Sequence, residues 1–477
     1  MNTRIGLLNF SLMRFCCLPN LAEVKRKEDV RRTLKRRSLM RANGTSMTLD
    51  MGKFHNEEKH TNSVKKVLFI AYHYPPEASS SGVLRALKFS KYLPGKGWWP
   101  QVLTLRKSLY TVTDEGLLLD IPSEVVVYRT FALDSARHLA IKGRHLACLS
   151  VPDRFVTWLF CAVPTGLSVI RNKNVQLIYS TSPPATAHMI AAALKLLTGV
   201  VWVADFRDPW IEEGVFPVAG SIRYWIESHL ERMVLRHCDS MIVTTPHLKA
   251  DFLARYPQIP STKIEVIYNG YDESDFGDLS IGISSGKFEI IHAGLVTPDF
   301  RNPLPLLEAV SSLIEENELP RDKVKITFLG GDVWLLSPEF TFHVERLGLT
   351  GVVSVEGRVS HRKALERLAH ASVLLLLQAS EDTRSLIPAK AFEYLRIGHP
   401  ILALAFEGAT AELLKGKDHC FVIEPHDMAN LKRALITLFK GWDRGDAPLQ
   451  LDRRANQFER ERLAGQLANI FDRTIIK

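Results

Sequence analysis

A cation and a carboxylate stand three residues apart near the start of a predicted helix in the second half of the chain. Lys390 and Glu393 belong to the sequence SLIPAKAFEYLRIGHP, and this spacing places both side chains on one helical face. Pro388 is typical of a first helical turn, and the apolar run Ile401–Ala405 predicts a strand beyond the helix. A cation at such a helix start can bind phosphate, and a carboxylate can accept hydrogen bonds from ribose hydroxyls. The pattern favours a sugar-nucleotide site, with a solvated surface ion pair as the alternative.

Two further carboxylates flank an arginine directly after another predicted strand. Asp205, Arg207 and Asp208 belong to the sequence ADFRDPW, which follows the apolar run VVWV. Carboxylates at a strand end can hydrogen-bond a polyol or position a hydroxyl group for attack. We therefore expect these three residues to be catalytic. The alternative is a turn closed by an Asp–Arg pair, with Pro209 and Trp210 packed beneath it.

Glycines and basic residues follow several other predicted strands. Gly294 and Gly330 each end a strand, where a nucleotide could approach the backbone closely. Arg301 precedes a predicted helix and could clamp a diphosphate, or could be an exposed surface charge. His73 and Gly82 belong to the loop HYPPEASSSG, which offers N–H groups to an acceptor or a phosphate, unless its prolines serve only to shape it. This loop is not a GxGxxG fingerprint, so a nicotinamide enzyme is disfavoured.

The sequence gives no sign of a metal site or a cofactor. No DxD-like acidic pair stands out at a predicted strand end, and the six cysteines are scattered without metal-ligand spacing. We therefore expect neither a metal nor a cofactor. The cysteine pattern is typical of a reduced, cytoplasmic protein.

Apolar runs alternate with helical patterns in two halves of the chain. Continuous apolar runs of this length are expected for parallel strands that are buried on both faces. In the first half they are Val67–Tyr72, Gln101–Leu105, Leu177–Ser180, Val200–Ala204, Ser240–Thr244 and Lys263–Ile267. In the second half they are Phe288–Ala293, Val324–Leu329, Val352–Glu356, Val373–Leu377 and Ile401–Ala405. The polar stretch 277–287 separates the halves, so we predict two doubly wound α/β domains, which bind ligands at the carboxyl ends of their strands.

The positive charge of the chain is concentrated at its beginning. The net charge is +9, but residues 1–50 hold 11 Lys/Arg and 4 Asp/Glu, which leaves the remainder nearly neutral. We therefore rank nucleic-acid binding last among the functions considered. Residues 1–63 are expected to be a disordered basic tail, or a start-site artefact if Met40, Met47 or Met51 is the true start.

Three apolar segments could contact a membrane surface. The run 155–170 has sixteen residues and contains Pro164, so it is shorter than the roughly 20 residues that a spanning helix needs. A buried or interfacial helix fits it better. The segment 215–225, together with Trp98 and Trp99, could complete an interfacial patch, with core packing as the alternative.

Taken in order, these stretches resemble glycosyltransferase family 4, and more narrowly its bacterial branch that adds sugars to cell-surface polysaccharide precursors. The matching sequences include VLFIAYHYPPEASSSG, STSPPATAH, VADFRDPW, VIYNGYDESDF and PAKAFEYLRIGHPILAL. They run in the family's order from about residue 64 to 410. The segment FERERLAGQLANIF is similar to the family's closing helix.

The resemblance implies a GT-B fold, in which two Rossmann-like doubly wound domains face a cleft. Residues 64–278 would form the acceptor domain, residues 287–450 the nucleotide-sugar domain, and residues 451–477 a closing helix that packs back on the first domain. It also implies metal-independent transfer, usually with retention of configuration. Glu393 matches the family's ribose-binding glutamate and Lys390 the lysine of the branch's K-x-F-E-Y-L pattern, while Arg301 falls near a phosphate-binding basic residue.

Two departures from the family pattern concern the donor. The first glutamate of the family's paired motif is Ser385 here, and no arginine follows Gly294 directly. The diphosphate would therefore rely on Arg301 and Lys390, and the identity of the sugar stays open.

The expected partners follow from the same resemblance. The donor would be a UDP-, GDP- or dTDP-sugar, and the acceptor a saccharide or a polyprenyl-diphosphate-linked sugar. We expect a cytoplasmic protein with peripheral contact to the inner face of the cell membrane and no nucleic-acid partner. The alternatives are a GT-B sugar-nucleotide epimerase and a catalytically silent scaffold of a polysaccharide assembly complex.

Overall fold

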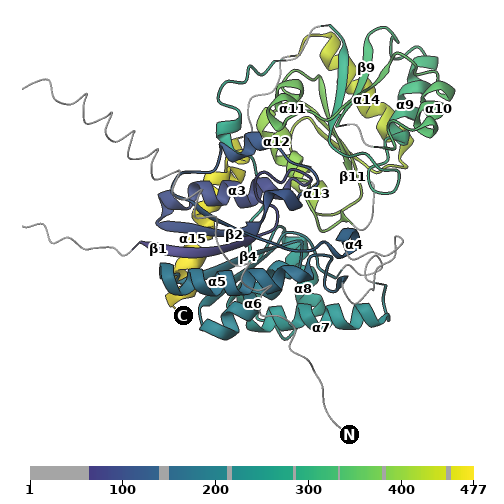
Figure 1. Cartoon of the computed structure of the whole chain (residues 1–477). Helices are drawn as coiled ribbons and strands as arrows, with labels where there is room; N and C mark the ends of the chain where they lie inside the picture. The colour runs from purple at the N-terminus through teal and green to yellow at the C-terminus, as the bar shows by residue number, and fades with distance from the viewer. Residues whose placement is uncertain are drawn as a thin grey trace, which may run out of the picture.

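Two parallel sheets, each flanked by helices, form the architecture of the chain (Figure 1). The computed structural model describes residues 64–138, 150–211, 218–282, 286–330, 333–378, 383–446 and 453–476. The predicted basic tail, residues 1–63, lies outside the described residues.

The first sheet has seven strands in the order β3-β2-β1-β4-β5-β6-β7, and every neighbouring pair is parallel. Its strands are β1 (Lys65–Ala71), β2 (Trp98–Leu105), β3 (Val126–Thr130), β4 (Leu177–Ser182), β5 (Val201–Phe206), β6 (Ser240–Val243) and β7 (Ile264–Val266). The helices of this domain are α3 (Gly82–Tyr92), α4 (Ser135–His138), α5 (Leu159–Lys173), α6 (Thr186–Thr198), α7 (Ile222–His237) and α8 (Pro246–Arg255).

The second sheet has six parallel strands in the order β10-β9-β8-β11-β12-β13. Its strands are β8 (Phe288–Ala293), β9 (Val324–Leu329), β10 (Val353–Glu356), β11 (Val373–Gln378), β12 (Ile401–Ala405) and β13 (Cys420–Ile423). Its helices are α9 (Leu304–Glu315), α10 (Pro338–Arg346), α11 (His361–Leu368), α12 (Ala389–Ile397), α13 (Ala409–Leu414) and α14 (Met428–Asp443).

Both sheets reverse their strand order at the same relative place. The reversal lies between β1 and β4 in the first sheet and between β8 and β11 in the second. Loops that leave neighbouring strands in opposite directions open a crevice at the carboxyl edge, which is the usual binding position in such sheets. The site residues are therefore expected at this edge, in the loops next to the reversal of each sheet.

The predicted pair of doubly wound domains is confirmed. Two strands were not predicted, β3 and β13. Both are edge strands whose residues are mostly half-buried. Their apolar runs, Val125–Tyr128 and Cys420–Ile423, are short, and a short apolar run does not by itself distinguish a strand from a helix. The run 155–170 contains a short 3-10 turn at Val156–Trp158 and, after it, most of the helix α5, which begins at Leu159. In the described part of the chain, no helix is both long and apolar enough to cross a membrane.

The C-terminal helix returns to the first domain. Helix α15 (Arg460–Ile476) lies beside α3, and its Leu467 and Phe471 share a core cluster with Tyr179 (Figure 1). Trp98 belongs to the same core: it is 0% exposed, and its indole N–H donates to Asp472. Of the two interpretations of Trp98, core packing is therefore correct and the membrane-facing one is wrong, because the returning helix covers the side chain.

Loops from the two sheets touch at the domain boundary. The Thr245 hydroxyl donates to the Ser385 carbonyl at 2.5 Å, and the Arg358 guanidinium donates to the Ala78 carbonyl. His247 and Glu412 lie 3.3 Å apart in the same region. The carboxyl edges of the two sheets thus approach each other.

Candidate functional site

A lysine and two glycines meet at the carboxyl edge of the second sheet. The Lys390 ammonium donates to the carbonyl of Ala293, and a β-carbon on Gly294 would lie 2.6 Å from Lys390 Nζ. Gly330 lies against Gly294, since a β-carbon there would come within 3.2 Å of the Gly294 carbonyl. The lysine head group therefore stands over bare backbone, where a phosphate group could approach it.

The surroundings of Lys390 disfavour its charged form. Burial and the neighbouring Arg301 guanidinium lower the pKa of Lys390 to about 7, although Glu393 opposes the shift. His292, 3.3 Å from Lys390 Nζ, is held neutral because burial and the Lys390 charge keep its pKa well below the usual value. The positive charges of Lys390 and Arg301 thus repel each other, and a bound diphosphate would relieve this repulsion.

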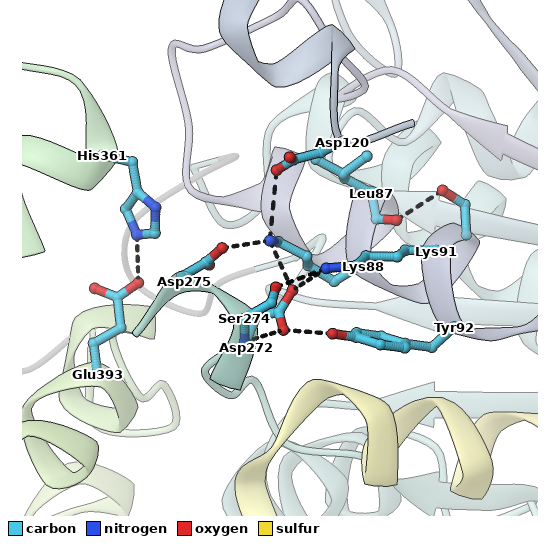
Figure 2. Close-up of polar contacts among 11 residues, drawn as sticks. Leu87, Lys88, Lys91, Tyr92, Asp120, Asp272, Ser274, Asp275, His361 and Glu393 are labelled. Atoms are coloured by element: carbon cyan, nitrogen blue, oxygen red, sulfur yellow. Dashed lines mark hydrogen bonds and ion pairs between the residues drawn. The ribbon is translucent and has the colours of Figure 1, made fainter. Parts of the chain in front are cut away.

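Glu393 lies one turn beyond Lys390 on α12 and pairs with a histidine from α11. His361 Nε2 is 2.9 Å from Glu393 Oε1. Figure 2 shows the two side chains pointing toward each other. Burial opposes ionisation of Glu393, yet the imidazolium of His361 lowers its carboxyl pKa. The carboxylate is therefore kept in the form that accepts hydrogen bonds.

On the first domain, Arg207 holds the loop after β4. Its Nε donates to the Ser182 carbonyl and its Nη2 to the Pro183 carbonyl, both at 2.7 Å. A β-carbon on Gly82 would lie 1.6 Å from Arg207 Nη1, so only a glycine lets the guanidinium reach the start of α3. Arg207 thereby fastens the loops after β4 and β5 to the helix that follows β1.

His73 and Asp208 lie near this guanidinium. His73 Nδ1 is 2.8 Å from the buried Glu77 carboxylate, which fixes the ring, and both Arg207 and Asp208 act on its charge. The Asp208 side chain is open to solvent, yet enough protein surrounds it for desolvation to raise its carboxyl pKa, against the pull of Arg207 and His73. An imidazole and a carboxylate, each with its pKa shifted by burial toward the neutral form, therefore lie near the same guanidinium.

Asp205 lies beneath this surface and is fully buried. Arg85 donates to both of its oxygens, at 2.9 and 2.8 Å, and the Tyr179 and Thr181 hydroxyls donate to Oδ2. This differs from the expected contact of Asp205 with an acceptor, because the carboxylate is already saturated. The cation pairing also lowers its pKa, although burial alone would raise it.

The predicted site residues therefore form two groups, one on each domain, and one further residue is buried beneath the first group. Gly294, Gly330, Arg301, Lys390 and Glu393 gather on the second domain. His73, Gly82, Arg207 and Asp208 gather on the first. Asp205 is buried beneath the first-domain group, where it pairs with Arg85.

Three polar residues of this region were missed in the sequence. Arg85 is 1% exposed and Arg460 2%, but charged residues in helical sequences are ordinarily read as solvated. His361 begins a helix after β10, directly behind the Ser360 cap. The position of His361 after a predicted strand was the one signal in the sequence. Its partner Glu393 is 32 positions away, so the local sequence does not indicate the pair.

Family models match both domains. The model described as Glycosyltransferase Family 4 matches residues 123–275, and the model described as Glycosyl transferases group 1 matches residues 287–441. The two matches fall on the first and second sheets respectively. No curated protein matches the sequence.

Solved glycosyltransferases share the fold. A sucrose-phosphate synthase from Thermosynechococcus elongatus superimposes with a TM-score of 0.63 at 15% identity, covering 86% of this chain and 99% of that one. Anabaena HepE in complex with UDP-glucose gives 0.60 at 15% identity, covering 86% and 99%. WaaG, a glycosyltransferase of lipopolysaccharide biosynthesis, gives 0.56 at 15% identity, covering 85% and 99%.

The family predicted from the sequence is thus confirmed by the matches on both domains and by the shared two-sheet architecture. The chain is thus a glycosyltransferase of the GT-B fold, in which a family 4 domain is followed by a group 1 domain.

Proposed function

We propose that this enzyme transfers a sugar from a UDP-, GDP- or dTDP-sugar to a saccharide acceptor in the synthesis of a cell-surface polysaccharide. The observation that supports the donor is the contact of Lys390 with the backbone at Gly294, where the charge of Arg301 also acts on the lysine, with Glu393 one helical turn away. Two cations with a nearby carboxylate match a nucleoside diphosphate, which carries two phosphates and ribose hydroxyls. Solved relatives of the same fold bind UDP and UDP-glucose.

The cations would act on the leaving group. In the transfer, the bond from the anomeric carbon to the diphosphate oxygen breaks, and the acceptor oxygen bonds to that carbon and loses its proton. Negative charge grows on the diphosphate, where Lys390 and Arg301 stabilise it. We assign them the role that a metal ion has in other transferases, and we propose that the transfer retains the anomeric configuration.

The acceptor would lie on the first domain. We assign its hydroxyl to Asp208 and His73, which face the same solvent-open space. Arg207 and Gly82 hold the surrounding loops, and the Arg85–Asp205 pair fixes the end of β5. Holding acceptor and donor in line supplies most of the acceleration in a reaction of this kind.

A lipid-linked acceptor would bring the enzyme to the cytoplasmic face of a membrane, and α7 offers the surface. Ile222 and Trp225 are 81% and 75% exposed, and Arg232 and Arg236 are exposed further along the same helix. The two acidic residues of α7, Glu227 and Glu231, are buried. An exposed surface of apolar and basic residues fits an anionic lipid surface.

The donor assignment is tested by a binding and hydrolysis screen. The purified protein is titrated with UDP-, GDP- and dTDP-sugars without added metal and again with a chelator, next to Glu393→Ala and the control Glu424→Ala. We expect saturable binding of one donor that Glu393→Ala loses and the control keeps. Epimerised sugar would favour an epimerase, and binding without turnover on any acceptor would favour a silent scaffold. A folded protein that binds no donor contradicts the proposal.

The membrane assignment is tested by flotation with vesicles that contain anionic lipid. We expect the wild type to float, and the double variant Ile222→Ser with Trp225→Ser to remain in solution. Phe342→Ser is the matched control, because Phe342 is 61% exposed on the other domain. Equal flotation of all three proteins would rule out α7 as the contact.

A further inference from the structure

The carboxylate of Glu393 is hydrogen-bonded by a single side chain in the described part of the chain, that of His361 (Figure 2). The atoms that meet are His361 Nε2 and Glu393 Oε1, 2.9 Å apart. The glutamate side chain is 14% exposed and the histidine 30%. The pair therefore lies at the edge of the donor site rather than in the core.

Both side chains come from firmly held helices. Helix α11 begins at His361, is capped by the Ser360 hydroxyl, and buries Leu365 and Leu368. Helix α12 buries Phe392 and Tyr394 on either side of Glu393. Because both backbones are fixed, the imidazole limits the directions in which the carboxylate can point.

The charges around the pair keep it ionic. Burial opposes the imidazolium, but Glu393 and Asp275 together raise the pKa of His361 above its usual value, against a smaller opposing effect from Lys88. Asp275 is itself engaged, with Lys88 Nζ 2.7 Å from it (Figure 2). Lys390 and Arg460 stand near Glu393 and favour its charged form.

The hydrogen bond to His361 leaves the Glu393 carboxylate able to accept further hydrogen bonds. A carboxylate has two oxygens and about four lone-pair positions, and the single bond to His361 occupies one of them. Ribose hydroxyls can therefore donate to the remaining positions while the histidine stays in place.

We propose that His361 is a positioning residue of the donor site, which holds the Glu393 carboxylate in the orientation that receives the ribose hydroxyls. This inference rests on the proposed function, in which Glu393 binds ribose. It adds a residue from a different helix, α11, to the determinants of donor affinity. His361 acts through Glu393, so it affects binding of the nucleotide and not the bond-breaking step.

The test measures binding of UDP, GDP and dTDP, each paired with its 3′-deoxy analogue, by calorimetry. The proteins are wild type, His361→Ala, His361→Gln and Glu393→Gln. For the nucleotide that binds, we expect His361→Ala to weaken affinity about tenfold, the range of a hydrogen bond to a charged group. His361→Gln should recover part of the loss, because the amide can still donate. In a turnover assay, the donor KM should rise while kcat stays nearly constant.

The 3′-deoxy analogue separates positioning from general damage. Without that hydroxyl, Glu393 has less to bind, so His361→Ala should weaken the analogue much less than the parent nucleotide. The matched control is His426→Gln, since His426 and Glu424 form another histidine–glutamate pair, 3.1 Å apart and exposed, in the same domain. This variant should bind both nucleotides like the wild type.

The outcomes distinguish the inference from the function on which it rests. If the wild type binds a nucleotide and both His361 variants bind it with the wild-type affinity, His361 has no positioning role and the proposed function stands. The same conclusion holds if His361→Ala weakens the parent nucleotide and its 3′-deoxy analogue equally. If a folded wild type binds none of the nucleotides, the proposed function fails, and the inference fails with it.

Discussion

The ammonium of Lys390 lies against Gly294, so closely that a β-carbon on the glycine would come within 2.6 Å of Nζ. The glycine has a φ of +123°, a conformation that side chains rarely adopt. The chain thus keeps one small residue at the place where the half-buried Lys390 meets the end of β8.

Replacing Gly294 by alanine should displace Lys390 and strain the backbone. We expect the free energy of unfolding to fall by about 1–3 kcal/mol, the usual range for a residue held in such a conformation, and donor affinity to fall with it. Urea unfolding and calorimetry measure the two effects. Gly277→Ala is the control, because its β-carbon would meet open space. Unchanged donor affinity in Gly294→Ala would show that donor binding does not require the close contact of Lys390 with Gly294.

Donor affinity should depend on pH through Lys390. Its pKa in the free enzyme is about 7, lowered by burial and Arg301, and a diphosphate stabilises the charged form. Below pH 7 the lysine is already protonated, so affinity is steady. Above pH 7 binding must take up a proton, and affinity should fall by up to about tenfold per pH unit.

Calorimetry between pH 6 and 9 checks this dependence, with Lys390→Gln as the comparison. The variant should bind more weakly at low pH and lose most of the slope. A wild-type affinity that stays constant up to pH 9 would contradict the assignment of the titrating group to Lys390.

The sequence predicted the central strands well because burial on both faces leaves a continuous apolar run. Runs such as Phe288–Ala293 and Val324–Leu329 coincide with β8 and β9. The edge strands β3 and β13 have only short apolar runs, Val125–Tyr128 and Cys420–Ile423, and were missed. Local pattern thus reports the core of each sheet, and pairing at the edge depends on neighbours that are distant in sequence.

The site could be predicted only in part, for a related reason. Lys390 and Glu393 share one helix, so their spacing carries the signal. The partners of Asp205 and Glu393, by contrast, are Arg85 and His361, 120 and 32 positions away. Nothing in the local sequence marks a charged residue as buried, and its partner is set by the fold.

The buried pair of Arg85 and Asp205 should matter for stability. Removing one partner leaves an unpaired buried charge, which typically costs about 3–5 kcal/mol, so Arg85→Met should lower the free energy of unfolding by that amount. The double variant Arg85→Met with Asp205→Asn should lose less than the sum of the two single variants. Urea unfolding measures all three. The exposed pair Arg444–Asp446 is the control, and Asp446→Asn should unfold like the wild type.

Asp208 should matter for transfer and not for folding. Its side chain is open to solvent and faces His73 and Arg207, so Asp208→Asn should leave urea unfolding and donor binding unchanged. If the carboxylate orients or deprotonates the acceptor hydroxyl, the transfer rate should fall about a hundredfold or more, in the range of general acid–base catalysis. Steady-state transfer at saturating donor measures the effect, once an acceptor is identified. Asp205→Asn provides the contrast, since it should lower stability as well as rate. An Asp208→Asn enzyme with full transfer rate and unchanged acceptor affinity would move the acceptor contact away from Asp208 and leave His73 as the residue to examine.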